Sequence, residues 1–89
     1  MRNTIYKYLL GTHGQSKILM PEGAKILDVK YQHGQFALWA IVDTDNSTEE
    51  SRYFTIYGTG HVMERDLDLK FISTVMISED LVFHVFEIL

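Results

Sequence analysis

The sequence contains no cysteine, and it lacks both a surplus of basic residues and any long apolar run. Without thiols the chain has no disulfide, no thiolate metal site and no cysteine nucleophile. Its formal net charge of −4 disfavours nucleic acid as a direct partner, because neutralising phosphates requires clustered lysine and arginine. No stretch approaches the roughly 20 apolar residues of a membrane-spanning helix, and the N-terminus has no signal-peptide pattern. We therefore expect a cytoplasmic protein with no membrane partner.

The composition is nevertheless that of a folded chain. Hydrophobic residues make up 46% and charged residues 22% of the 89 positions, which excludes intrinsic disorder. A chain of this length holds one core, and no repeat or linker divides it, so we expect one β domain over residues 1–89. Charge is uneven, with net +3 over residues 1–30 and net −7 over residues 31–89. That asymmetry fits either a solvated β surface or a bipolar molecule that self-associates or docks a charged partner.

Apolar residues recur at every second position far more often than every 3.6 positions, which is the pattern of strands. Turn residues punctuate these runs at 21–23, 33–34, 58–61 and 78–80. Residues 62–70 are ambiguous and allow at most one short helical turn. The expected fold class is all-β, a small antiparallel sandwich or partly open barrel of six to seven short strands. The expected strands cover residues 4–10, 15–20, 25–32, 36–42, 52–57, 71–77 and 81–88.

Two of these strands allow an expectation about burial. The alternation in residues 25–32 sends Leu27, Val29 and Tyr31 inward. Residues 36–42 are apolar on both faces, which is typical of a strand in the middle of a sheet. We therefore place the centre of the core on this strand, with Trp39 buried and its indole N–H bonded to a buried acceptor.

The first strand carries an aromatic face. Tyr6, Tyr8 and Leu10 alternate onto one side, whereas Ile5 and Leu9 take the other. At a sheet edge such a stripe suits contact with a second copy of the chain, because a small β domain rarely buries both faces of its strands. We expect a homo-oligomer with Tyr6, Tyr8 and Leu10 at the interface.

The most suggestive polar segment is residues 58–61, Gly-Thr-Gly-His. Its two glycines allow backbone N–H groups to converge on an anion, while the threonine and histidine add side-chain donors. Arginines and tyrosines nearby in the sequence suit phosphate pairing and base stacking. A turn that needs positive φ accounts for the segment as well, since it matches no nucleotide-binding fingerprint. The candidate ligand-binding residues are Gly58, Thr59, Gly60, His61, Arg52, Tyr57 and Arg65.

The sequence offers no enzymatic constellation. No Gly-x-Ser-x-Gly nucleophile elbow is present, and the histidines are not paired at a spacing typical of zinc ligands. His84, inside an apolar strand, is expected to be hydrogen-bonded within the fold. A small metal-dependent hydrolase that joins His61 to His84 is the one catalytic alternative left open. We predict no enzyme activity, no catalytic residue, no metal and no cofactor.

Five segments are familiar as an ordered set: TIYKY (4–8), MPEGAKIL (20–27), LWAIVD (38–43), GTGH (58–61) and FHVFE (83–87). In this order they resemble a family of small phage- and prophage-encoded proteins that carry one domain of unknown function. Residues 71–75 are similar to the penultimate strand of that family, with Ser73 where a glycine is expected. The resemblance implies a bacteriophage setting, a cytoplasmic location and one compact domain. It supplies no catalytic residue.

The leading hypothesis is a non-catalytic, oligomeric binding module of phage type that counters a host defence component. Its favoured form captures a small anionic, nucleotide-like ligand stoichiometrically at the 58–61 loop and a neighbouring subunit. Its other form is a protein–protein inhibitor that presents the acidic surface around Asp43 and Glu50, residues 43–50. An accessory or assembly protein of the virion is the alternative from a different class.

Overall fold

The structure is a computed structural model that describes residues 2–12 and 14–89. The strands are β1 (Asn3–Leu10), β2 (Gln15–Pro21), β3 (Lys25–Gln32), β4 (Gln35–Asp43), β5 (Glu49–Gly58), β6 (Leu69–Met76) and β7 (Val82–Ile88). This confirms the expected all-β class. The stretch 62–70 contains no helical turn, because it forms an irregular loop that ends where β6 begins. No helix occurs in the described residues, so none of them forms a membrane-spanning helix.

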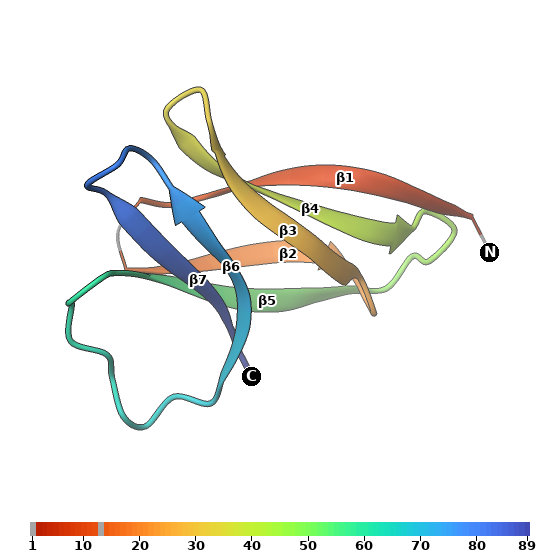
Figure 1. Cartoon of the computed structure of the whole chain (residues 1–89). Helices are drawn as coiled ribbons and strands as arrows, with labels where there is room; N and C mark the ends of the chain where they lie inside the picture. The colour runs from red at the N-terminus through yellow and green to blue at the C-terminus, as the bar shows by residue number, and fades with distance from the viewer. Residues whose placement is uncertain (1, 13) are drawn as a thin grey trace.

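The strands form two antiparallel sheets, with strand orders β1-β4-β3 and β2-β5-β7-β6. Figure 1 shows the sheets as two layers of a sandwich, and β3 of one sheet packs against β6 of the other. At the opposite margin β1 and β2 are consecutive in the chain but belong to different sheets. The sandwich is therefore joined at its β3–β6 margin and is not closed into a barrel.

The hairpin between β3 and β4 is fixed by its two-residue connection. Gln32 pairs with Gln35, while His33 and Gly34 both have positive φ, 53° and 76°. That combination is typical of a type I′ turn, whose twist matches that of the flanking strands. His33 adopts the left-handed region without the freedom of glycine, as histidine does more readily than most residues.

The core lies between the two sheets. The largest fully buried side chains are Phe54, Met20, Leu38, Val29, Val42 and Val85. They come from five strands, which alternate so that every second side chain faces the opposite layer. Burial of these side chains against one another is the main favourable term in folding.

Trp39 corrects one expectation. Strand β4 is the middle strand of its sheet, as predicted, but Trp39 is half-buried and lies outside the core. It points to the face of β4 away from the second sheet, where the Lys7 ammonium lies 5.9 Å from its ring centroid. The apolar residues on both faces of this strand predict that protein covers both faces, but the second sheet packs against only one of them. The Lys7 side chain, which reaches Gln32 of β3, covers part of this outer face.

A bulge in β3 corrects a second expectation. The pairing with β4 shifts between Ile26 and Asp28, so the side-chain alternation changes phase at Leu27. Ile26 packs against the core, and Leu27 is 42% exposed. Val29 is buried as predicted. The period-two pattern alone assigned Leu27 to the wrong face because it assumed an unbroken ladder.

The two sheets are tied together by a polar contact beside this bulge. The Asp28 carboxylate accepts hydrogen bonds from the Ser73 hydroxyl of β6 and from the Val29 N–H at 2.8 Å. Partial burial would raise the pKa of Asp28, but these bonds and the Lys30 ammonium at 3.4 Å outweigh it and hold the pKa below its ordinary value. Ser73, at the position where a glycine was expected, thus supplies a hydroxyl that joins the layers.

Replacing Leu38 with alanine is expected to lower the free energy of unfolding by about 2–5 kcal/mol, because Leu38 is fully buried and the loss leaves a cavity. Leu19, 56% exposed on β2, is the matched control, and Leu19→Ala should cost under about 1 kcal/mol. Urea denaturation of both variants measures the difference. Equal losses would contradict the placement of the core.

Replacing Asp28 with asparagine is expected to lower stability by about 1 kcal/mol at pH 7, since the amide nitrogen cannot accept the Ser73 bond. Because the folded pKa of Asp28 is lowered, its contribution is present above the unfolded value of about 3.9 and is lost as pH falls through the folded value. The two chains should therefore converge in stability at low pH. Denaturation at pH 7, 5 and 3 tests this, with Asp66→Asn in the exposed loop as control. A difference between wild type and Asp28→Asn that persists undiminished at pH 3 would contradict it.

Candidate functional site

An ion pair inside the four-stranded sheet organises one end of the sandwich. Glu87 of β7 is only 6% exposed, and the guanidinium group of Arg52 on β5 forms a bidentate ion pair with its carboxylate. Nε donates to Oε2, and Nη2 donates to Oε1 at 2.9 Å. This bond to Glu87 raises the pKa of Arg52, although partial burial acts in the opposite direction. A bidentate, desolvated pair of this kind fixes both side chains in one geometry.

The remaining nitrogen of Arg52 holds the turn between β2 and β3. Nη1 donates to the Ala24 carbonyl at 2.8 Å, and it lies 3.8 Å from Glu50. Glu50 in turn accepts the Gly23 N–H at 2.8 Å. All three guanidinium nitrogens are therefore engaged within the chain. Three of its five N–H donors are used in these bonds, and Arg52 thereby positions the start of β3.

This pair lies in a cleft of about 400 Å³ between β3 and β6, which we call the β3–β6 cleft. Lys25 and Lys70 line it and are exposed, and neither forms an ion pair with a described residue. Exposed apolar side chains, Leu27 and Phe71, complete its walls. The lining residues are Gly23, Ala24, Lys25, Ile26, Leu27, Arg52, Lys70, Phe71, Ile72 and Glu87.

The β3–β6 cleft carries a net positive charge, whereas the chain as a whole is negatively charged. Its lining holds three cationic side chains and one carboxylate, in a protein of formal net charge −4. Arg52 and Glu87 neutralise each other, which leaves the ammonium groups of Lys25 and Lys70 as the unpaired charges. Two unpaired cations beside exposed apolar walls form a setting that attracts an anion.

Sequence reasoning missed the β3–β6 cleft because its two lysines lie far apart in the chain. Lys25 opens one strand and Lys70 lies near the start of another, and each reads as an ordinary solvated charge. They line one cleft only because β3 and β6 pack together at the joined margin. The alternation of both strands was visible in the sequence, but their neighbourhood was not.

The predicted anion loop, residues 58–61, uses most of its donors internally. The Gly58 N–H donates to His61 Nδ1 at 3.2 Å, and the His61 N–H returns to the Gly58 carbonyl at 3.0 Å. The Thr59 N–H donates to the Val82 carbonyl at 3.1 Å. Of the four backbone N–H groups, only that of Gly60, which has φ 87°, is left without such a bond. The segment is a closed turn whose amides do not converge on an open anion site.

Gly58 is required by this turn for a steric reason. A Cβ added there would lie 2.7 Å from His61 Cε1 and 2.8 Å from Nδ1, closer than real contacts allow. The histidine ring therefore packs directly on the glycine backbone, where the hydrogen bond from the Gly58 N–H to Nδ1 also holds it.

His84 lies between two threonine hydroxyls. Its Nε2 is 2.8 Å from Thr59 Oγ1, and its Nδ1 is 3.0 Å from Thr74 Oγ1. Since Thr59 Oγ1 also donates to the Val82 carbonyl at 3.3 Å, we assign Nε2–H as the donor to Thr59 and Thr74 as the donor to Nδ1. His84 is thus hydrogen-bonded within the fold, as predicted. In the series Thr59–His84–Thr74, the group bonded to His84 Nδ1 is the neutral hydroxyl of Thr74. In a catalytic triad that place is taken by a carboxylate, whose negative charge stabilises the imidazolium.

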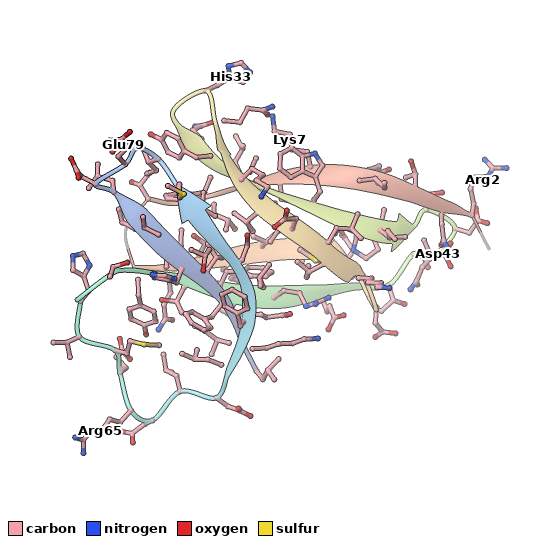
Figure 2. All side chains as sticks on the ribbon, viewed as in Figure 1. Arg2, Lys7, His33, Asp43, Arg65 and Glu79 are labelled. Atoms are coloured by element: carbon pink, nitrogen blue, oxygen red, sulfur yellow. The ribbon has the colours of Figure 1, made fainter. Side chains whose placement is uncertain are left out.

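The other candidate residues are dispersed. Arg52 precedes Gly58 by six residues of β5, about 20 Å along an extended strand, so one small ligand does not reach both. Tyr57 packs edge-on against Phe86 at a centroid distance of 6.1 Å, and its buried hydroxyl has no hydrogen-bond partner. Figure 2 shows Arg65 on the outer bend of the loop, pointing away from the sheets.

The two histidines of the metal alternative have separate partners. His61 bonds to Gly58, whereas His84 bonds to the two threonines, and no hydrogen bond joins the rings. Among residues 2–12 and 14–89, no group of three or more His, Asp or Glu side chains comes together as a metal site.

The predicted interface residues of β1 differ in accessibility. Tyr6 is 45% exposed, while Tyr8 is half-buried, packs against the core and meets Tyr6 edge-on at 6.4 Å. Burial, followed by the neighbouring Tyr6 and Glu49, raises the pKa of Tyr8. Leu10 is 4% exposed and belongs to the core, which corrects its assignment to an interface. It pairs with Phe36 at the end of β1, where the second sheet covers the strand.

Gly58→Ala is expected to lower the free energy of unfolding by about 1–2 kcal/mol, because the new methyl group displaces His61 and breaks the bond to Nδ1. The three nearest atoms to that methyl group all belong to His61. In a His61→Ala background the same substitution should therefore cost under about 0.5 kcal/mol. A double-mutant cycle measured by urea denaturation gives the coupling, and additive losses would show that another contact requires the glycine.

Comparison with known proteins gives a family but no relative of established activity. No curated protein and no solved structure matches the chain significantly. One protein family matches residues 1–88, almost the full length of the chain. The chain belongs to this family, whose description is domain of unknown function DUF7352.

Proposed function

We propose that the protein is a non-catalytic binding module that holds a small anionic ligand in the β3–β6 cleft. The single observation that carries the proposal is the presence of two unpaired lysines, Lys25 and Lys70, in one cleft beside the Arg52–Glu87 pair. Each lysine would donate charge-assisted hydrogen bonds to the ligand, which are the strong class of such bonds. Arg52 acts as a positioning residue, because its bond to Ala24 fixes the turn from which Lys25 projects.

The shape and walls of the cleft favour a ligand with both a charged and an apolar part. Its volume of about 400 Å³ lies within the range of small-molecule sites. Phe71 is 56% exposed and Leu27 is 42% exposed, so the walls offer a ring face and an aliphatic surface beside the ammonium groups. A phosphate attached to a planar base combines these features. We therefore keep the nucleotide-like class of ligand and assign it to this cleft instead of the 58–61 loop.

The biological role extends this proposal to the phage setting that the sequence resemblance implies. A module that retains a nucleotide stoichiometrically, with no turnover, would remove a signal on which a host defence component depends. What supports this step is the ligand-sized cationic cleft. The role is an analogy of mechanism and depends on the ligand being bound first.

Isothermal titration at 0.05 M and 0.15 M NaCl, with ADP, AMP and inorganic phosphate as probes, tests the binding site. We expect ADP to bind, Lys25→Ala and Lys70→Ala each to weaken its affinity about tenfold or more, and added salt to weaken it further. Lys17→Ala is the matched control, since Lys17 is an exposed lysine on β2 outside the cleft. Native mass spectrometry of the purified chain reports any ligand retained from the cell.

Two results would overturn the assignment. The first is that no probe binds and no small molecule is retained in the native mass spectrum. The second is an equal loss of affinity in Lys17→Ala and in the cleft variants, which would indicate unspecific charge attraction. Circular dichroism of each variant separates lost binding from lost folding.

The protein-directed form of the hypothesis has its own supporting observation, because the acidic loop is rigidly built. The Asp43 carboxylate accepts hydrogen bonds from the backbone N–H groups of Asp45 at 3.0 Å and Arg2 at 3.2 Å. These bonds lower the pKa of Asp43, the bond from Asp45 having the larger effect. The Thr44 N–H donates to the Arg2 carbonyl at 2.8 Å. A preformed acidic loop loses little conformational entropy when it docks on a basic protein surface. This form, or a virion accessory role, becomes the leading proposal if no small ligand is found.

A further inference from the structure

The four outer edges of the two sheets are not equally protected. Strands β3 and β6 pack against each other, so their edges face one another at the joined margin. Strand β2 ends in Pro21 and carries Lys17, residues that discourage pairing with another strand. Strand β1 is the remaining edge, and it has neither proline nor a bulge over its eight residues.

The one charged side chain of β1 does not guard this edge. Lys7 Nζ donates to Gln32 Oε1 of β3 at 2.6 Å and lies 5.9 Å from the centre of the Trp39 ring. Its side chain therefore crosses the outer face of the sheet, over β4, instead of projecting from the open edge (Figure 2). A lysine that projects from an edge strand normally deters strand addition, but the Lys7 side chain lies across the face of its own sheet.

The register of β1 with β4 shows which backbone groups are free. The Thr44 N–H donates to the Arg2 carbonyl at 2.8 Å, so Arg2 and Thr44 form a hydrogen-bonded pair. Hydrogen-bonded and non-bonded pairs alternate along an antiparallel ladder, so the even-numbered residues of β1 bond to β4. The odd-numbered residues point their N–H and C=O groups to the open edge. These are Asn3, Ile5, Lys7 and Leu9.

We propose that a second copy of the chain occupies this edge, with the two β1 strands antiparallel and the two-fold axis at Tyr6. This register pairs Ile5 with the partner's Lys7 and Asn3 with the partner's Leu9, so all four free residues on each chain are bonded. It joins the two three-stranded sheets into one of six strands.

Alternative registers are less favourable for stated reasons. An axis at Lys7 places Asn3 opposite Gly11, beyond the end of the partner strand, so fewer backbone groups are paired. An axis at Ile5 leaves Leu9 beyond the end of the partner strand, so fewer backbone groups are paired. The axis at Tyr6 pairs the whole length from Asn3 to Leu9 and opposes each lysine to an aliphatic side chain.

The same register covers the exposed side chains of β1. Ile5 is 57%, Tyr6 is 45% and Leu9 is 49% exposed, and they lie on both faces of the strand. At the axis the two Tyr6 residues form a non-bonded pair, in which Cα atoms approach to about 4.5 Å and the rings contact each other. The dimer is independent of the anion proposal, since β1 contributes no residue to the β3–β6 cleft.

Disulfide trapping tests the register directly, because the chain has no cysteine of its own. Tyr6→Cys should cross-link to a species of twice the 10.3 kDa chain mass on a non-reducing gel, since the expected Cα separation suits a disulfide. Thr4→Cys is the matched control. Its partner position is Tyr8, so two Thr4 sites would lie about 13 Å apart and should not cross-link.

A second pair of variants keeps Tyr6 in place. Ile5→Lys puts an ammonium on the covered edge, whereas Ile5→Val, the matched control, keeps a β-branched aliphatic side chain there. Sedimentation at 0.15 M NaCl, where long-range charge effects are screened, should give a dimer dissociation constant about tenfold lower for Ile5→Val than for Ile5→Lys.

The dimer is overturned if the native chain sediments as a monomer at 100 µM. The register is overturned if Thr4→Cys cross-links as readily as Tyr6→Cys, or if Tyr6→Cys fails to cross-link while the native chain is dimeric. The use of the β1 edge is overturned if the two Ile5 variants associate equally.

Discussion

The buried carboxylate of Glu87 is the constraint on which one end of this molecule depends. An ionised group at 6% exposure is strongly unfavourable unless it is paired and hydrogen-bonded, and Arg52 supplies both requirements through two nitrogens. The third nitrogen holds the Ala24 carbonyl, so the pair also fixes the turn from β2 to β3. Removing one partner alone would leave a buried charge and release that turn, a change that typically costs about 3–5 kcal/mol.

The same pair explains why the cationic cleft lies where it does. Arg52 is paired with Glu87 and bonded to the Ala24 carbonyl, so the unpaired cations that line the cleft are the ammonium groups of Lys25 and Lys70. Those lysines come from the two strands that join the sheets, and the Asp28–Ser73 contact ties these strands at their bulges. Packing at the joined margin and the proposed ligand site thus depend on the same polar contacts.

At the other end of the sandwich, polar side chains hold the 58–61 turn against the neighbouring strands. His61 packs on Gly58, and His84 bonds to Thr59 and Thr74, so the 58–61 turn is attached to β7 and β6. The open margin behaves differently, because β1 exposes three large apolar side chains and a row of free backbone groups. This open edge is where the proposed dimer would form.

Alternation and turn chemistry in the sequence were sufficient to determine the seven strands, the antiparallel hairpins, and the middle position of β4. The strands and hairpins depend on contacts between near neighbours in the chain, which a period of two and a few turn residues encode, whereas the position of β4 followed from its two apolar faces. Tertiary structure alone decided that Trp39 faces outward, that Leu27 sits in a bulge, that Arg52 is paired with Glu87, and that Lys25 and Lys70 line one cleft. The bulge lies within one hairpin, but an unbroken period of two does not encode it. The other three features depend on which strands distant in the chain become neighbours, and packing of the two layers makes that choice.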